Sequence, residues 1–69
     1  MPRGTVKWFE WQRGYGFIQP EARGGKDVIV YVSAVERAGL SGLNEGQIVD
    51  YEVVTNDGTI SAGTVKVQR

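Results

Sequence analysis

The chain lacks the two side chains on which most metal and redox chemistry in proteins depends. Its 69 residues include no cysteine and no histidine. Without cysteine there is no disulfide, no thiolate zinc site and no iron–sulfur cluster. Without histidine the commonest general base and the commonest transition-metal ligand are both missing. We therefore expect a binding protein and not an enzyme, with no cofactor and no metal.

Long apolar runs are also missing. No stretch has the length of a transmembrane helix, and none resembles the apolar centre of a secretory signal peptide. A chain this short buries only about 60% of the surface of its unfolded form. Its core then supplies about 3–5 kcal/mol of net stability. We expect residues 1–69 to form one cytoplasmic domain that does not contact a membrane.

Net charge is the third absence, because eight basic residues balance eight acidic ones. The two halves of the chain differ in this respect. Residues 1–32 carry five basic and three acidic side chains, whereas residues 33–69 carry three basic and five acidic ones. Most of the aromatic residues lie in the basic half. An asymmetry of this size favours nucleic-acid binding only weakly.

Glycine, valine and isoleucine are abundant, which is typical of short strands joined by turns. The residue pattern predicts strands over 5–10, 14–19, 27–32, 48–55 and 60–67. Residues 56–58, Asn-Asp-Gly, tolerate positive φ and predict a hairpin between the last two strands. Alternation in those two strands directs six apolar side chains inward: Val49, Tyr51, Val53, Ala62, Val65 and Val67.

Only residues 33–39 favour a helix. Ser33 and Glu36 have the spacing of a capping box with Ser33 as the N-cap, and Gly39 can end the helix. This segment has room for a single turn. Five strands with one helical turn after the third predict an all-β, five-stranded antiparallel barrel, because closure removes exposed sheet edges. An SH3-like barrel is the alternative at this length.

The most informative segment for function is residues 13–18, RGYGFI. Strand alternation places Tyr15 and Phe17 on one face and the intervening Gly16 on the other. Glycine within a strand indicates either a bend or a bulge, or a bare backbone from which flat rings project. Nucleic-acid bases stack on such rings at about 1–3 kcal/mol each. Surface rings also serve cross-strand packing, but the set formed with Trp8 and Tyr31 favours binding.

The same segment resembles the start of a ribonucleoprotein motif. An RNA-recognition-motif fold requires its apolar motif upstream and two full helices. Here the apolar run 28–32 lies downstream, and the chain has no full helix. We therefore reject that fold.

Three segments resemble bacterial cold shock proteins: 4–9 (GTVKWF), 13–18 (RGYGFI) and 27–35 (DVIVYVSAV). Residues 43–47 (LNEGQ) and 61–63 (SAG) extend the resemblance over nearly the whole chain. The resemblance implies an oligonucleotide-binding (OB) barrel that binds single-stranded RNA and DNA and acts as an RNA chaperone. It also implies a set of residues that contact nucleic acid, with Phe9 at the margin: Lys7, Trp8, Phe9, Arg13, Tyr15, Phe17, Asp27 and Tyr31.

The chain departs from the family pattern at several of these places. Ile29 and Tyr31 stand in a third-strand motif that usually reads Val-Phe-Val-His, so that one stacking ring is lost and a different one is present. Glu10 adds a negative charge where the family usually has a small polar residue. Trp11 is an unusual aromatic residue, either a new stacking ring or a cover over the barrel mouth. Leu40 stands at a loop position that is aromatic in some relatives.

These departures leave alternatives to nucleic-acid binding. One is a diverged or redesigned cold-shock scaffold that has weak or no nucleic-acid affinity and serves stability or protein binding. Another is an SH3-like module that recognises proline-rich peptides through the aromatic residues. We expect a monomer, although the aromatic face is also an exposed patch through which copies could associate.

Overall fold

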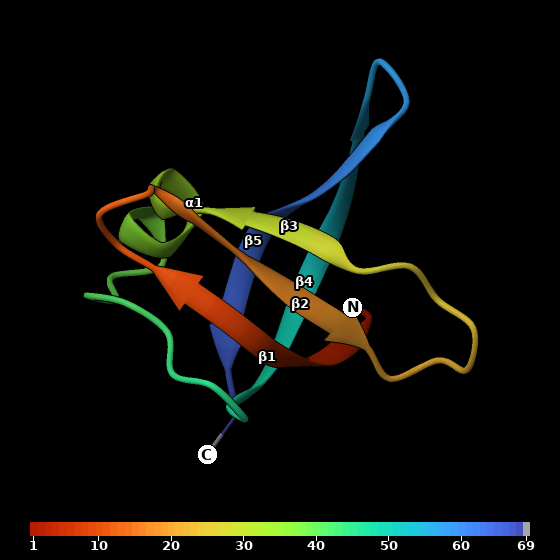
Figure 1. Cartoon of the computed structure of the whole chain (residues 1–69), viewed down its shortest axis with the longest axis horizontal. Helices are drawn as coiled ribbons and strands as arrows, with labels where there is room; N and C mark the ends of the chain where they lie inside the picture. The colour runs from red at the N-terminus through yellow and green to blue at the C-terminus, as the bar shows by residue number, and fades with distance from the viewer. Residues whose placement is uncertain (69) are drawn as a thin grey trace.

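The computed structural model describes residues 1–68 as five strands and one short helix (Figure 1). The predicted strands are confirmed to within two residues at each end. The elements, in chain order, are β1 (Arg3–Glu10), β2 (Tyr15–Pro20), β3 (Val28–Tyr31), α1 (Val32–Arg37), β4 (Ile48–Asn56) and β5 (Thr59–Val67).

The strands close into a barrel in the order β1-β2-β3-β5-β4, which confirms the predicted all-β class. The prediction of a wholly antiparallel sheet is wrong, since β3 and β5 pair in parallel through Ile29 with Ser61 and Val30 with Ala62. The reason is one of parity. Five strands in a closed ring cannot alternate direction all the way round, so one neighbouring pair must run in parallel. Figure 1 shows α1 beside the end of β3, at the start of the connection from β3 to β4.

The barrel interior is filled by small and branched apolar side chains around one large ring. Val6, Ile18, Val30 and Val49 are fully buried, and so is Tyr51. Burial raises the pKa of the Tyr51 phenol, because the charged phenolate would lose its hydration. Three of the last-strand predictions hold, since Ala62 and Val65 are buried and Val67 packs against the core.

Val53 contradicts the prediction of an inward side chain, as it is 47% exposed. The register between β4 and β5 shifts between Tyr51 and Val53, where Gly63 and Thr64 together face Glu52. The extra residue of this β-bulge lies on β5, so the alternation along β4 is not interrupted and Val53 pairs with the buried Ala62. Val53 is exposed because the two strands continue past the barrel (Figure 1). Beyond the bulge, β4 and β5 leave the barrel as a projecting hairpin (Figure 1). Its two-residue turn has positive φ at both Asp57 (52°) and Gly58 (80°), which confirms the hairpin prediction.

The helix spans six residues, and its capping differs from the prediction. Tyr31 occupies the N-cap position with no side-chain hydrogen bond, so Ser33 is not the N-cap and no capping box forms. Tyr31 is still extended as the last residue of β3, and the chain enters the helix directly at Val32. The C-terminus agrees with the prediction: Gly39 has φ of 79° and its N–H donates to Glu36 O at 2.9 Å. Leu40 N–H donates to Val35 O, which completes a Schellman motif.

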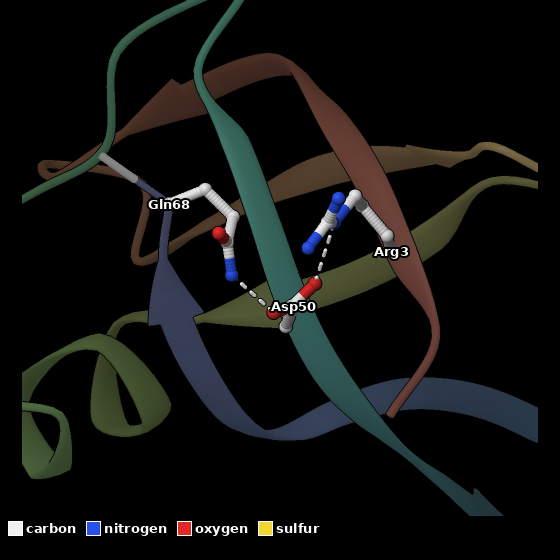
Figure 2. A network of polar contacts seen from close by, with 3 residues as sticks. All are labelled: Arg3, Asp50 and Gln68. Carbon is white, nitrogen blue, oxygen red and sulfur yellow. Dashed lines mark hydrogen bonds and ion pairs between the residues drawn. The ribbon is translucent and has the colours of Figure 1, made fainter.

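A polar contact network joins β1 to β4 and to the residue after β5. Arg3 Nε lies 2.9 Å from Asp50 Oδ1, and the Gln68 amide donates to the other carboxylate oxygen. Figure 2 shows Arg3 and Gln68 approaching Asp50 from either side of β4. The hydrogen bond and charge of Arg3 hold the pKa of the Asp50 carboxyl below its usual value, against a smaller opposing effect of desolvation. This contact braces the barrel away from the predicted binding residues.

Candidate nucleic-acid interface

A β-bulge in β1 decides which side chains face outward. The register with β2 pairs Val6 with Ile18 and then Trp8 with Phe17, so that Lys7 is an extra residue on β1. Strict alternation from the buried Val6 would direct Trp8 into the barrel. The inserted residue reverses the alternation, and as a result both Lys7 and Trp8 lie on the outer surface.

Two rows of outward positions then cross β1, β2 and β3. The first row consists of Trp8, Phe17 and Ile29, which are paired in register. The second row, two residues later on β1 and β3 and two residues earlier on the antiparallel β2, consists of Glu10, Tyr15 and Tyr31. We call these six residues the outer face. Neighbouring strands are about 4.8 Å apart, which makes the six side chains neighbours. Four of the six are aromatic, and the other two are Ile29 and Glu10, the departures noted in the sequence.

Three rings of the outer face contact one another. Trp8 and Phe17 are stacked, with centroids 6.0 Å apart and planes inclined at 29°. The Tyr15 ring is steeply inclined to both, with its centroid 5.4 Å from that of Trp8 and 5.8 Å from that of Phe17. Tyr31 lies beside Tyr15 on β3 and is 45% exposed. The structure thus brings together four of the predicted contact residues on one surface.

Gly16 holds the strands beneath these rings close together. A Cβ atom at this position would lie 2.6 Å from Phe9 Cα and would overlap the carbonyl oxygen of Trp8. The residue is therefore glycine because β1 and β2 approach too closely for any side chain. Of the two sequence interpretations, the bend is closer to this finding, although the bulge is on β1 and not on β2.

Both predicted cations are paired with carboxylates at the borders of the outer face. Lys7 Nζ lies 3.0 Å from Asp27 Oδ2, which places both of these predicted residues beside the Trp8 row. Arg13 Nε lies 2.7 Å from Glu10 Oε2, beside the Tyr15 row. All four side chains are at least 38% exposed, so that a ligand can reach them.

Phe9 is the predicted contact residue that the structure separates from the others. Phe9 pairs with Gly16 in the register of β1 and β2, and its ring points to the inner side of the sheet, where it packs against the core. Trp11, which is 47% exposed on the turn after β1, meets the Phe9 ring edge-on at 6.5 Å. This contact favours the interpretation of Trp11 as a cover for the end of the barrel over that of a ring on the outer face.

The sequence reasoning missed a hollow of about 270 Å³ between Tyr31 and the β4–β5 hairpin. Its lining is polar apart from the tyrosine ring and consists of Tyr31, Asn56, Asp57, Thr59 and Ser61. Ser61 reaches this place because it pairs with Ile29 across the parallel contact of β3 and β5. The odd strand number predicts that one pair of neighbouring strands is parallel but not which pair, and the outward course of the hairpin had no signal in the sequence.

A small closed barrel of five strands in this order, with exposed rings on β1, β2 and β3, has the architecture of an oligonucleotide-binding domain. The family model for the 'Cold-shock' DNA-binding domain matches residues 2–68. No helix within residues 1–68 is long and apolar enough to cross a membrane.

Individual cold shock proteins align with nearly the whole chain. Cold shock protein CspA of Rhizobium meliloti is 52% identical over 68 residues, which cover 96% of this chain and 97% of the relative. The probable cold shock protein y4cH of Sinorhizobium fredii is 50% identical with the same coverage. Cold shock protein CspB of Geobacillus stearothermophilus is 47% identical over 68 residues, which cover 97% of this chain and 100% of the relative. The chain belongs to the cold-shock domain family, whose members bind nucleic acid and are not enzymes.

Proposed function

We propose that residues 1–69 act as one monomeric, cytoplasmic cold-shock domain that binds single-stranded RNA and DNA by base stacking and serves as an RNA chaperone. The observation that carries the proposal is the stacked pair Trp8 and Phe17, with Tyr15 against both and Tyr31 beside them. Flat rings on a rigid sheet are a stacking surface that tolerates any base, because every base has a π face.

Base stacking explains a preference for single strands. In a duplex the base faces are already stacked on their neighbours, so the rings of the outer face have no partner there. A protein that binds only unpaired bases shifts the pairing equilibrium of RNA toward the open form by mass action. This is the physical content of chaperone activity, and it needs no cofactor.

Polar groups around the rings supply the remaining contacts. In this proposal Lys7 and Arg13 contact phosphates, and the Asp27 carboxylate accepts hydrogen bonds from base edges. The exposure of these three side chains supports the assignment. The hollow beside Tyr31 offers hydroxyl and amide groups to a base that stacks on that ring. With two to four phosphate contacts, the log of the affinity falls with the log of the salt concentration at a slope of about −1.4 to −2.8.

A second candidate function is a scaffold with little nucleic-acid affinity, and three observations favour it. Ile29 removes a ring from the first row of the outer face, Glu10 places a charge in the second, and both cations are already paired. The chain would then serve stability or bind a protein, including another copy through the exposed rings.

A fluorescence titration separates the two candidates. We expect a single-stranded thymine heptamer to quench Trp8 with micromolar or tighter affinity, since Trp8 lies within the outer face. The chain has a second tryptophan, so the titration uses a Trp11→Phe variant in which Trp8 is the sole reporter. A duplex of the same length is the control and should quench little. Absence of quenching by the single strand, from folded protein at high micromolar ligand, would favour the scaffold.

A further inference from the structure

Glu10 is the one charged residue among the six residues of the outer face. It is the last residue of β1 and lies directly opposite Tyr15 in the register of the sheet. Its carboxylate therefore stands in the same row as two stacking rings. An anion at this place repels the phosphates of any strand whose bases stack on Tyr15.

The partner of this carboxylate is a cation that the proposed function requires. Glu10 Oε2 lies 2.7 Å from Arg13 Nε, and the two residues are three apart across the turn after β1. The turn itself is held by the Gly14 N–H, which donates to Glu10 O at 3.0 Å. The side chains of Arg13 and Glu10 are 65% and 44% exposed, so a phosphate oxygen can compete with the carboxylate for the guanidinium.

The ion pair between Lys7 and Asp27, at the border of the outer face, joins residues from two different segments of the chain. Asp27 comes from the segment before β3 and reaches Lys7 across the intervening strand β2. Its carboxylate has a use in the proposed function, as an acceptor for base edges. The side-chain contact that the structure gives Glu10 is the one with Arg13. With both pairs formed, the charges at the borders of the outer face cancel.

We propose that Glu10 is a specificity-determining residue that competes with phosphates for Arg13 and so makes binding depend more on bases. The inference rests on the proposed function, because it concerns the same surface. An exposed ion pair is weak, so the effect is a shift in affinity and not a block. Because Glu10 competes for Arg13, the protein makes fewer phosphate contacts than its surface cations would allow. The log of the affinity then falls less steeply with the log of the salt concentration.

The test compares Glu10→Gln with Glu45→Gln. Both variants raise the net charge by one, but Glu45 lies on the loop before β4 and is not one of the six residues of the outer face. Binding of a thymine heptamer is followed by tryptophan fluorescence at about 50 mM and about 200 mM salt. We expect Glu10→Gln to bind about three- to fivefold more tightly at the lower salt and to steepen the log–log slope by about 0.7, the value for one further phosphate contact. Glu45→Gln should bind as the wild type does.

Arg13→Ala, made in the wild type and in Glu10→Gln, shows whether the gain passes through Arg13. We expect this change to weaken binding about three- to fivefold in the Glu10→Gln background and by a smaller factor in the wild type, where Glu10 already occupies Arg13 for part of the time. Circular dichroism melting curves establish that each variant is folded. Equal affinity and slope in Glu10→Gln and the wild type would overturn the inference and leave the proposed function intact, as would equal gains from both glutamine variants. No binding by either the wild type or Glu10→Gln would instead overturn the proposed function.

Discussion

The outer face of β1, β2 and β3 and the projecting β4–β5 hairpin both expose apolar side chains, yet they differ in what a ligand would meet. The outer face presents flat rings that touch one another over a closely packed sheet. The hairpin presents Val53, Val54 and Ile60, which are between 39% and 47% exposed. Branched aliphatic side chains have no π face on which a base can stack. We therefore propose the contiguous rings, and not exposed apolar area alone, as the nucleic-acid interface.

The two regions also differ in how closely they are packed underneath. Beneath the rings, β1 and β2 approach so closely that Gly16 is required. The hairpin lies beyond the bulge at Gly63 and Thr64, outside the barrel core. A rigid support keeps rings in place without the ligand ordering them, which lowers the entropic cost of binding.

The largest effect is expected when this support is broken. Gly16→Ala places a methyl group against the backbone of β1 and should reduce the free energy of unfolding by about 3 kcal/mol. That is most of the stability of a domain this size, so affinity should fall with the folded fraction. Urea unfolding measures the loss. Gly42→Ala is the matched control, because a Cβ there meets only the Phe9 ring at 4.0 Å, and wild-type behaviour of Gly16→Ala would refute the packing argument.

Removal of a ring should affect binding but not folding. Phe17→Ala takes away one half of the stacked pair with Trp8 and should weaken binding of a thymine heptamer by about 2 kcal/mol. Val54→Ala removes an exposed apolar side chain of the hairpin and should leave the affinity unchanged. Isothermal calorimetry on the two variants gives the comparison directly. Equal losses would mean that apolar area, and not ring stacking, drives binding.

Addition of a ring to the first row of the outer face should tighten binding, whereas a ring added to the hairpin should not. Ile29→Phe extends the row from Trp8 and Phe17 onto β3 and should tighten binding by about 1 kcal/mol. Ile60→Phe adds the same ring to the hairpin and serves as the control. If the two variants gain equally, the position of the ring in the row has no importance.

The smallest effect concerns the acid stability of the barrel. Because Asp50 has a lower pKa in the folded protein than in the unfolded chain, its ionised form stabilises the fold above the unfolded-state pKa. That contribution is lost as the pH falls through the folded-state value. Asp50→Asn should lower the urea midpoint at neutral pH and flatten its decline in acid, while Glu45→Gln keeps the wild-type profile. An unchanged profile in Asp50→Asn would contradict the role given to the Arg3 contact.

Local residue pattern was enough to predict the strands, the hairpin turn and the end of the helix, because glycine and alternating valine act over a few residues. It failed at Ser33, where the capping-box spacing does not reveal that β3 continues to Tyr31 and leaves no N-cap position for serine. It also failed at Val53, since alternation gives the face of a strand but does not show that the β4–β5 hairpin continues past the barrel (Figure 1).

For the site, Tyr15 and Phe17 followed from alternation within their own strand. Trp8 did not, because its outward direction depends on the bulge at Lys7, and a β-bulge is a property of two paired strands. The same bulge directs Phe9, the residue after Trp8, to the inner side of the sheet and so separates it from the other rings. The hollow at Tyr31 depends on contacts between β3 and β5, more than twenty-five residues apart in the chain, which no local pattern contains.

The measurement that tests the central claim most directly is a heteronuclear NMR titration of the chain with a thymine heptamer. It reports the backbone amides and both indole N–H groups in one experiment. We expect the largest shifts at the Trp8 indole and at the amides of Tyr15, Phe17 and Tyr31, with small shifts at Trp11 and none at Val54. Shifts concentrated on the hairpin valines, with the Trp8 indole unmoved, would contradict this expectation.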